Sequence, residues 1–170
     1  MKTSIKRNYL EINSIQNLSE VFKPSNNLNI ILIEKSDFQL NRFFYKEIGK
    51  KHRWTDRLSW TEKNWIKYVN NSNIKTYVLK EDQNLVGYFE QIFHNEKKDC
   101  EIAYFGILEE FIGKKYGGYL LSEAIKESFN LGVKRVWVHT CSLDHKNALN
   151  NYRSRGMKIF KSETISVNTL

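Results

Sequence analysis

Several short stretches of this sequence hold residues whose types and spacing could do chemistry. The stretch GKKYGGYLL, residues 113–121, places three glycines and two lysines directly before an apolar run. Asn147 and Tyr152 lie five residues apart, and Glu90 and Glu101 stand in apolar, aromatic-rich runs. A phenol can donate a proton to a leaving group and a carboxylate can accept one. These side chains are therefore candidates for acid–base catalysis.

A glycine-rich bend that follows a strand and opens a helix is suited to hold an anion. Backbone N–H groups and the positive end of the helix dipole converge at such a bend, and glycine lets the backbone approach a phosphate because it has no Cβ. The spacing of Gly113, Gly117 and Gly118 fits neither GxxxxGK[ST] nor GxGxxG. From the bend alone, a phosphate site and a purely structural turn both stay open.

The stretch HTCSLDH offers a rival site. His139 and Cys141 alternate along a predicted strand and His145 follows, which suggests a metal site or a thiol nucleophile. Zinc sites usually have four ligands with pairs at recognisable spacing. Neither a CxxC nor an HxxxH pair is present. We therefore expect no metal here and no nucleophilic cysteine.

Composition bounds the class of protein. The 170 residues fit one domain, 1–170, and a hydrophobic content of 41% is enough for a core. The formal charge of +8 favours polyanionic partners such as nucleic acid, anionic lipid or a phosphorylated cofactor. Lysines are spread along the whole chain, so a solvated basic surface without a specific partner is an equal alternative. No RNA-binding motif is recognisable, and we do not expect a nucleic-acid partner.

Cysteine content and the N-terminal sequence bear on the location of the protein. Two cysteines are too few for a disulfide framework, and the start MKTSIKRNYLEI lacks the apolar core of a signal peptide. No apolar run approaches the roughly 20 residues that span a bilayer. We expect a cytoplasmic protein that does not enter membranes. The oligomeric state stays open, a homodimer included.

The elements that must position these residues alternate between strands and helices. Residues 1–28 form an N-terminal extension in which Tyr9 to Ile12 predicts an extra strand, and Asn29 to Glu34 predicts a buried strand. Apolar residues at helical spacing predict a helix from Phe38 to Ile48. Ser59 with Glu62 has the spacing of a capping box for a second helix, about 61–69.

The second half of the chain contains the candidate chemistry. Residues 74–80, 84–93 and 100–108 alternate apolar and polar positions and predict a three-stranded antiparallel unit. Helical periodicity begins after Gly117, residues 133–140 predict a strand, and Asp144 is a plausible N-cap of a helix that Gly156 ends. The tail 157–167 predicts one strand or two.

Two of these stretches together resemble a known family. LEEFIGKKYGGYLL after the strand EIAYFGI, and HKNALNNYRSRGMKIF after a second strand, resemble the GCN5-related N-acetyltransferase (GNAT) family. Its acetyl-CoA loop has the pattern [Q/R]xxGx[G/A], and its next helix carries Asn-x-x-x-x-Tyr-x-x-x-Gly-Phe. Here Ile112 stands at the Gln or Arg position, Lys115 at a glycine position and Met157 in place of Phe. The resemblance covers roughly residues 29–160.

The resemblance implies an α/β fold of the α+β kind: a mixed, mostly antiparallel sheet flanked by helices and splayed where acetyl-CoA inserts. Acetyl-CoA would be the cosubstrate, with no metal. The loop's backbone N–H groups would hold its pyrophosphate and Asn147 its pantetheine arm, while the splayed strand supplies a backbone donor for the thioester oxygen. We expect Lys115 to avoid a strained positive φ and to add a charge near the phosphates. The implied cofactor-binding residues are Phe105, Gly106, Ile107, Ile112, Gly113, Lys114, Lys115, Tyr116, Gly117, Gly118, Asn147 and Tyr152.

The implied reaction is direct transfer of acetyl from acetyl-CoA to a primary amine in a ternary complex. Deprotonating an alkyl amine with a pKa of about 10.4 at pH 7 costs roughly 4.6 kcal/mol, so a base is useful. Glu101 resembles the family's glutamate, which in several members acts through water, and Glu90 is a second candidate. Tyr152 is the candidate acid that protonates the departing thiolate.

The acceptor and one other function class stay open. Tyr88, Phe89 and Tyr104 could line an acceptor pocket, or they could be ordinary core aromatics. A small amine, an amino acid, an antibiotic, and a protein N-terminus or lysine are all compatible acceptors. The alternative to an enzyme is a basic module that binds acyl-CoA or RNA without turnover. Asn147 and Tyr152 beside a glycine loop favour the enzyme.

Overall fold

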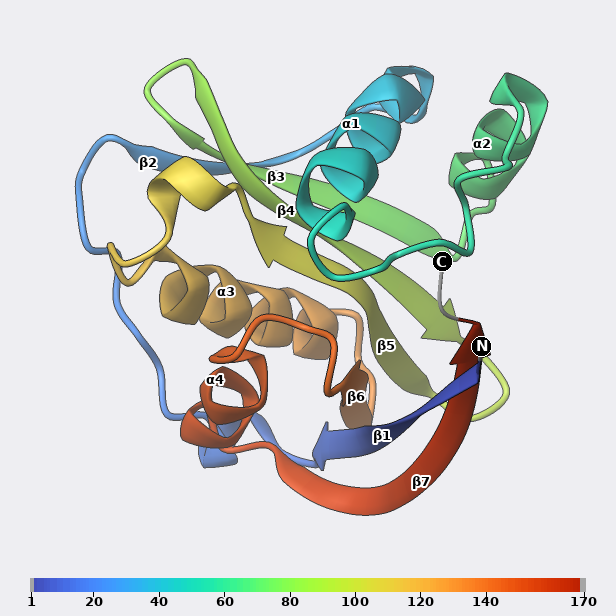
Figure 1. The fold of residues 1–170 in the computed structure, drawn as a ribbon. Coiled ribbons are helices and arrows are strands. Elements are labelled where there is room, and N and C mark those ends of the chain that lie inside the picture. The colour runs from blue at the N-terminus through green and yellow to red at the C-terminus, as the bar shows by residue number, and fades with distance from the viewer. Residues whose placement is uncertain (1, 169–170) are drawn as a thin grey trace.

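The computed structural model describes residues 2–168, so the ends of the predicted domain, residues 1 and 169–170, lie outside it. Strands and helices alternate along most of the chain (Figure 1). The strands are β1 (Lys2–Ile12), β2 (Leu28–Leu32), β3 (Ile74–Glu81), β4 (Asn84–His94), β5 (Asp99–Ile107), β6 (Arg135–Cys141) and β7 (Lys158–Asn168). The helices are α1 (Phe38–Gly49), α2 (Glu62–Val69), α3 (Tyr116–Asn130) and α4 (Ala148–Ser154).

All seven strands form one sheet, in the order β2-β3-β4-β5-β6-β1-β7. Neighbouring strands pair antiparallel, except that β5 and β6 pair parallel. The helix α3 forms the crossover connection between these two strands. A mixed, mostly antiparallel sheet flanked by helices is the architecture that the sequence predicted, and the structure confirms it.

The parallel pair β5–β6 parts soon after it begins. Its register runs only from Asp99↔Arg135 to Glu101↔Trp137, although both strands continue beyond. On the other edge of β5 the register shifts, since Gln91 faces Ile102 while Glu90 faces Tyr104. Ala103 is thus an extra residue, and such a bulge bends its strand. The two strands diverge beyond Glu101, which confirms the expected splay.

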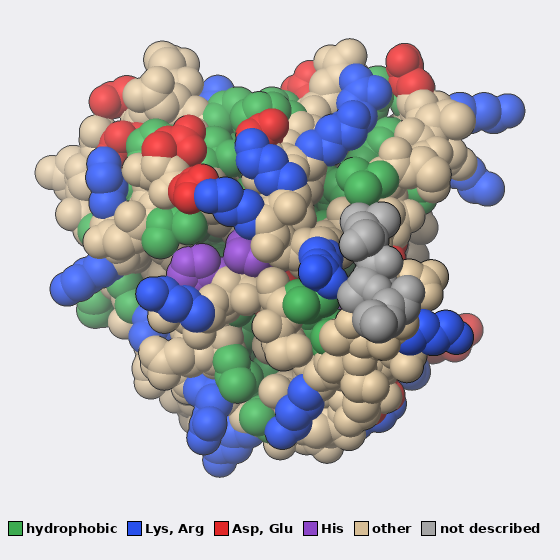
Figure 2. Space-filling view, viewed as in Figure 1, with side chains coloured by type: hydrophobic (Ala, Val, Ile, Leu, Met, Phe, Trp, Pro, Cys, Tyr) green, Lys and Arg blue, Asp and Glu red, His purple; other side chains and the backbone are tan. Residues whose placement is uncertain are grey.

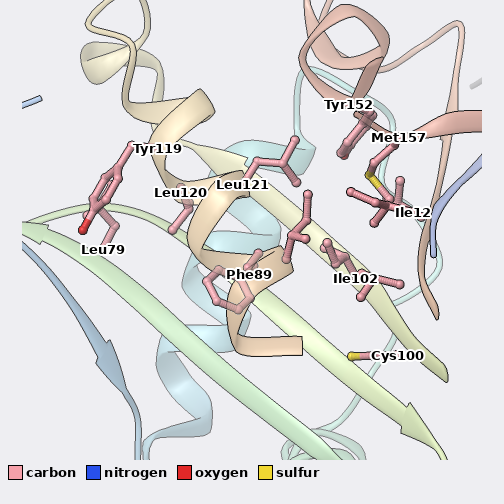
Figure 3. Packing of buried hydrophobic residues seen from close by; sticks show 14 of the residues in the cluster. Ile12, Leu79, Phe89, Cys100, Ile102, Tyr119, Leu120, Leu121, Tyr152 and Met157 are labelled. Atoms are coloured by element: carbon pink, nitrogen blue, oxygen red, sulfur yellow. The ribbon is translucent and has the colours of Figure 1, made fainter. Parts of the chain in front are cut away.

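Helices cover both faces of this sheet, because alternate residues of a strand point to opposite sides. Leu79 and Phe89 pack with Leu120 and Leu121 of α3 on one face (Figure 3). Their neighbours Val78 and Tyr88 pack with α1 on the other face, where Phe44 stacks on Tyr88 at 4.9 Å between ring centroids. Helices α3 and α4 therefore lie on one face of the sheet and α1 and α2 on the other. The gap between β5 and β6 can be reached from both faces.

The predicted N-terminal strand is real but longer, and it lies inside the sheet. We expected Tyr9 to Ile12, whereas β1 spans Lys2–Ile12. It pairs with β6 on one side and β7 on the other, so its first residue faces Asn168. The tail forms one strand, β7, rather than two. Strands from the two ends of the chain thus build the sheet beside the gap.

Two local expectations were wrong. The strand predicted as buried, β2, is an edge strand, with Ile31 and Leu32 about half exposed. The N-cap of α2 is Thr61 rather than Ser59, and its capping-box partner is Asn64. For β2 the apolar pattern was present, but the strand has a partner on one side only. For α2 the capping pattern was present, but the neighbouring Thr61 takes the cap in place of Ser59.

Candidate functional site

A cavity of about 620 Å³ opens where β5 and β6 part. Its wall includes the bend before α3, the second half of β5, the inner side of α4, and residues of β6 and β1. The loop after α1 closes it from the other face with residues 52–56. The cavity therefore joins the two faces of the sheet through the gap.

The bend before α3 presents amide groups to this cavity. Gly113 has φ of 93° and Lys115 has φ of 67° with ψ of 12°, after which α3 begins at Tyr116. The first turn of a helix leaves its N–H groups without intrahelical acceptors. The amide of Tyr119 donates to the Lys115 carbonyl at 3.4 Å, and the amides from Gly113 to Gly118 have no backbone acceptor among residues 2–168, which leaves them for an anion. Our expectation for Lys115 was wrong, since it adopts the left-handed conformation usually taken by glycine.

Helix α4 lies against this bend and carries the predicted tyrosine. Asn151 Nδ2 donates to the Gly117 carbonyl at 3.2 Å, which ties α4 to α3. Tyr152, 6% exposed, packs edge-on against Phe105 of β5 at 6.3 Å between centroids and still borders the cavity. Burial, and then the charge of Asp144, raise the pKa of its phenol. The phenol is therefore protonated at neutral pH and can donate a proton.

Asn147 rather than Asp144 stands at the N-cap position of this helix, although its side chain makes no capping hydrogen bond. We expected Asp144 at the N-cap, but α4 begins after Asn147. The Asp144 carboxylate instead accepts from the Thr140 hydroxyl at 2.5 Å and from the Cys141 amide at 3.0 Å. It thereby orders the turn after β6. Asn147 borders the cavity from the start of α4.

Arg155 was missed by sequence reasoning. It ends α4, borders the cavity, and its Nε is buried without a hydrogen-bond partner among the described residues. A Cβ at Gly118 would lie only 2.7 Å from Arg155 Nη1. Because Gly118 has no side chain, the Arg155 guanidinium can pack against α3 at this position. An unpaired guanidinium beside free helix amides favours an anion. The family motif gave no signal for this residue.

The second half of β5 lines the gap with backbone groups. Phe105, Gly106 and Ile107 all border the cavity, and beyond Glu101 no β6 residue pairs with them. A glycine within a strand can mark a bulge or a close approach of another element. The bulge of β5 lies at Ala103, so Gly106 belongs to the second case. A Cβ at Gly106 would meet Ile48 Cγ2 at 2.7 Å, so close packing of α1 is what requires this glycine.

The opposite wall of the cavity carries a different set of side chains. Arg7 and Cys141 face each other across β1 and β6, and His139 lies two residues before Cys141 on the same face. Trp54 packs on Tyr104 at 4.9 Å between centroids, and Asp56 borders the same space. This wall has aromatic faces and both signs of charge, as a site for a polar organic molecule would.

The two predicted glutamates do not border this cavity. Glu101 is the last residue of β5 that pairs with β6, and its Oε2 lies 3.0 Å from His94 Nε2. Glu90 is fully buried, and Arg57 donates to both of its oxygens, at 3.0 and 3.2 Å. Asn41 and Tyr68 donate to it as well, at 2.9 and 2.8 Å. Its contacts are those of a buried structural ion pair.

The rival Cys and His stretch gives no metal site in the part of the chain that the structure describes, where no three His, Cys, Asp or Glu side chains converge suitably. His145 lies near His52, at 6.0 Å between ring centroids. Burial, followed by the charge of Asp144, raises the pKa of the Cys141 thiol. A protonated thiol is a weak nucleophile.

The remaining predicted residues fall into place around the bend. Ile112, Gly113, Lys115, Tyr116, Gly117 and Gly118 border the cavity. Lys114 does not, because its ammonium lies over the Phe111 ring at 5.4 Å. Tyr88 and Phe89, considered for an acceptor pocket, are core residues with no exposed surface. Tyr104 alone of those three aromatics reaches the cavity.

Figure 2 shows basic side chains spread over the viewed face, with histidines near its middle. The lysines and arginines do not merge into one continuous stripe in this view. Within residues 2–168, no helix has the length and apolar character needed to cross a membrane.

Comparisons with known proteins agree with this geometry. Residues 35–157 match the model of the acetyltransferase (GNAT) family. No curated protein matches the chain significantly. An aminoglycoside acetyltransferase, meta-AAC0020 from an uncultured soil metagenomic sample, is 16% identical with a TM-score of 0.65, over 78% of this chain and 90% of that one.

Two further solved structures show the same fold. A GCN5-related N-acetyltransferase from Sphaerobacter thermophilus is 15% identical with a TM-score of 0.74; the match covers 95% of this chain, which spans only 50% of that protein. The PaiA N-acetyltransferase from Thermoplasma acidophilum in complex with coenzyme A is 18% identical with a TM-score of 0.50, over 62% of this chain and 74% of that one.

Proposed function

The chain belongs to the GNAT family of acetyltransferases, and we propose that it transfers acetyl from acetyl-CoA directly to a primary amine bound in the same cavity. The observation that carries this proposal is the gap between β5 and β6. It has free helix amides on one face of the sheet, a buried phenol beside it, and an aromatic, charged wall on the other face.

The residues present fit coenzyme A as a substrate. The amides from Gly113 to Gly118 and the unpaired Nε of Arg155 would take its phosphates. Lys115 borders the same end of the cavity and adds a positive charge. The edge of β5 that faces the gap, where pairing with β6 has ended, would take the pantetheine arm and supply a fixed backbone donor for the thioester oxygen. Asn147 would contact the arm from the start of α4.

Tyr152 is the proposed general acid. The departing thiolate must gain a proton, and the raised pKa of this buried phenol keeps its proton in place until then. The contact with Phe105 holds the ring at the edge of the gap. Cys141 stays outside the chemistry, so no acetyl-cysteine step is needed.

The proposed acceptor is a cationic amine. Asp56 borders the cavity on the α1 and α2 face, next to the rings of Trp54 and Tyr104, and is free of ion pairs among the described residues. A carboxylate beside aromatic faces favours an ammonium group. The structural neighbour in complex with the aminoglycoside sisomicin makes polyamine antibiotics a reasonable first class to test.

A screen of primary amines with acetyl-CoA, following release of free thiol, tests the proposal. The panel should hold aminoglycosides, polyamines, amino acids and lysine peptides. We expect acetyl-CoA alone to raise the Tm, by the equivalent of about 2.7 kcal/mol at 100 times its Kd. Stabilisation with no thiol release from any amine would favour a non-catalytic acyl-CoA-binding protein. Absence of stabilisation at millimolar acetyl-CoA would refute the assignment.

A further inference from the structure

The proposed reaction needs a base, and neither predicted glutamate borders the cavity. A histidine of β6 does. His139 borders the cavity on the α1 and α2 face, two residues beyond the last β5–β6 pair at Trp137. Its ring packs against Tyr9 of β1 at 5.6 Å between centroids. We propose that the acceptor amine binds between Asp56 and His139 and that His139 takes its proton. This inference rests on the proposed function.

The ring nitrogens of His139 are available to a ligand. The other three histidines of the chain each hydrogen-bond a protein group. Within residues 2–168 the His139 ring has no such partner, although it is open to the cavity. A base must reach the proton it removes, directly or through one water. His139 borders the cavity in which the amine would bind, and neither Glu90 nor Glu101 does.

The position also suits the direction of attack. The phenol of Tyr152 and the helix amides approach the gap from the α3 and α4 face, because Tyr152 packs in the core beneath α3. His139 lies on the opposite face, since it is paired in register with Tyr9 rather than with the core residue Leu10. Acid and base therefore stand on opposite sides of the gap. An amine from the His139 side would meet a thioester whose sulfur faces Tyr152.

The surroundings keep His139 neutral. The His139 side chain is exposed toward the cavity. Partial desolvation of the ring there lowers its pKa below the usual 6.5, and the positive charge of Arg7 lowers it further. Three carboxylates act in the opposite direction with smaller effect. The charged and titratable groups around the ring are Arg7 and Tyr9 of β1, Glu101 of β5, Asp144 of the turn after β6, and Asp56 of the closing loop. A neutral imidazole at pH 7 can accept a proton at once.

The proton balance is as follows. The ammonium of the acceptor gives one proton to a ring nitrogen of His139, and the free nitrogen attacks the thioester carbonyl. The carbon–nitrogen bond forms and the carbon–sulfur bond breaks, while Tyr152 protonates the thiolate. The acetylated nitrogen then gives its second proton to the Tyr152 phenolate, which restores the phenol. His139 then releases its proton to water, so one proton leaves per turnover.

The test is the pH profile of kcat/KM for His139→Gln, measured with the fastest amine of the screen. For the wild type, kcat/KM should fall as the pH drops through the lowered pKa of His139. The variant should lose this acidic limb and about 100- to 10,000-fold in kcat, the usual contribution of a base. The loss should be smallest with hydroxylamine, which is already unprotonated at neutral pH. His94→Gln is the matched control, because His94 lies outside the cavity, and it should keep the limb.

Two further measurements separate catalysis from structure. The Tm of His139→Gln and its rise with acetyl-CoA should match those of the wild type, and added imidazole should restore part of the activity of His139→Ala. In the wild type, the ring resonance of His139 in an NMR titration should give a pKa below 6.5. A pKa above 6.5, or a limb kept in His139→Gln but lost in Glu101→Gln, would overturn the assignment. If acetyl-CoA neither binds nor reacts with the wild type, the proposed function fails and this inference with it.

Discussion

Glu90→Gln provides a sharp test of how the closing loop is held over the cavity. Glu90 is fully buried and Arg57 is 6% exposed, and the guanidinium donates to both carboxylate oxygens. The same guanidinium lies over the rings of Tyr68 and Tyr104, at 4.1 and 4.2 Å. The substitution keeps the shape of the side chain but leaves the arginine charge buried and unpaired.

The expected loss of stability follows from this geometry. Breaking a buried ion pair by removing one partner costs about 3–5 kcal/mol. For a protein of this size each kcal/mol lowers the Tm by roughly 2–4 °C. We therefore expect a drop of roughly 6–20 °C, measured by circular dichroism during heating. Glu47→Gln is the control, because it removes an exposed partner of Lys50, and its Tm should equal that of the wild type.

A second comparison tests the cause of the loss. Replacing both partners with apolar residues, as in Arg57→Met with Glu90→Met, removes the unpaired charge and should recover much of the Tm. A drop below about 2 °C for Glu90→Gln would refute the buried-pair reasoning. If that variant kept its Tm but lost turnover, Glu90 would instead belong to the catalytic groups.

Two further substitutions examine the acid and a strained turn. Tyr152→Phe should lower kcat about 100- to 10,000-fold while acetyl-CoA still raises the Tm, and unchanged thiol release would exclude Tyr152 as the acid. Gly156→Ala should lower stability by about 1–3 kcal/mol or more, because φ is 103° and the new Cβ would lie 2.1 Å from the Asn17 carbonyl oxygen. Gly132→Ala, with φ of 80° but nothing within 4 Å, should cost less, and equal Tm losses in the two variants would contradict the predicted clash.

Local pattern predicted the fold well wherever neighbours in sequence are neighbours in space. The meander β3–β4–β5 and the helix α3 follow from alternation and helical periodicity, since their partners lie close along the chain. The pattern failed for β1 and β2. Only Tyr9 to Ile12 were predicted in β1, because residues 2–8 are mostly polar and their pairing with β7 leaves no signal in the local sequence.

The candidate site divides in the same way. The bend and Tyr152 could be found from motifs, because their chemistry depends on local spacing. Arg7, Arg155 and His139 could not be placed at the cavity without the fold, since they come from three separate elements. Glu90 resembled a free strand carboxylate because Arg57, its partner, stands in a loop 33 residues away in sequence. Aspartate is a common N-cap residue, which is why Asp144 was predicted at that position. Only its hydrogen bonds to Thr140 and Cys141 show that it orders a turn instead.

The interior position of β1 has a consequence for how this molecule is made. A ribosome makes β1 before β2 to β5, yet within residues 2–168 the neighbours of β1 in the sheet are β6 and β7. Strand β1 must therefore wait at least until β6 has been made, and closing so long a loop slows folding. Until then Arg7 has no pairing partner, so the cavity wall that carries Arg7 and Cys141 is assembled late.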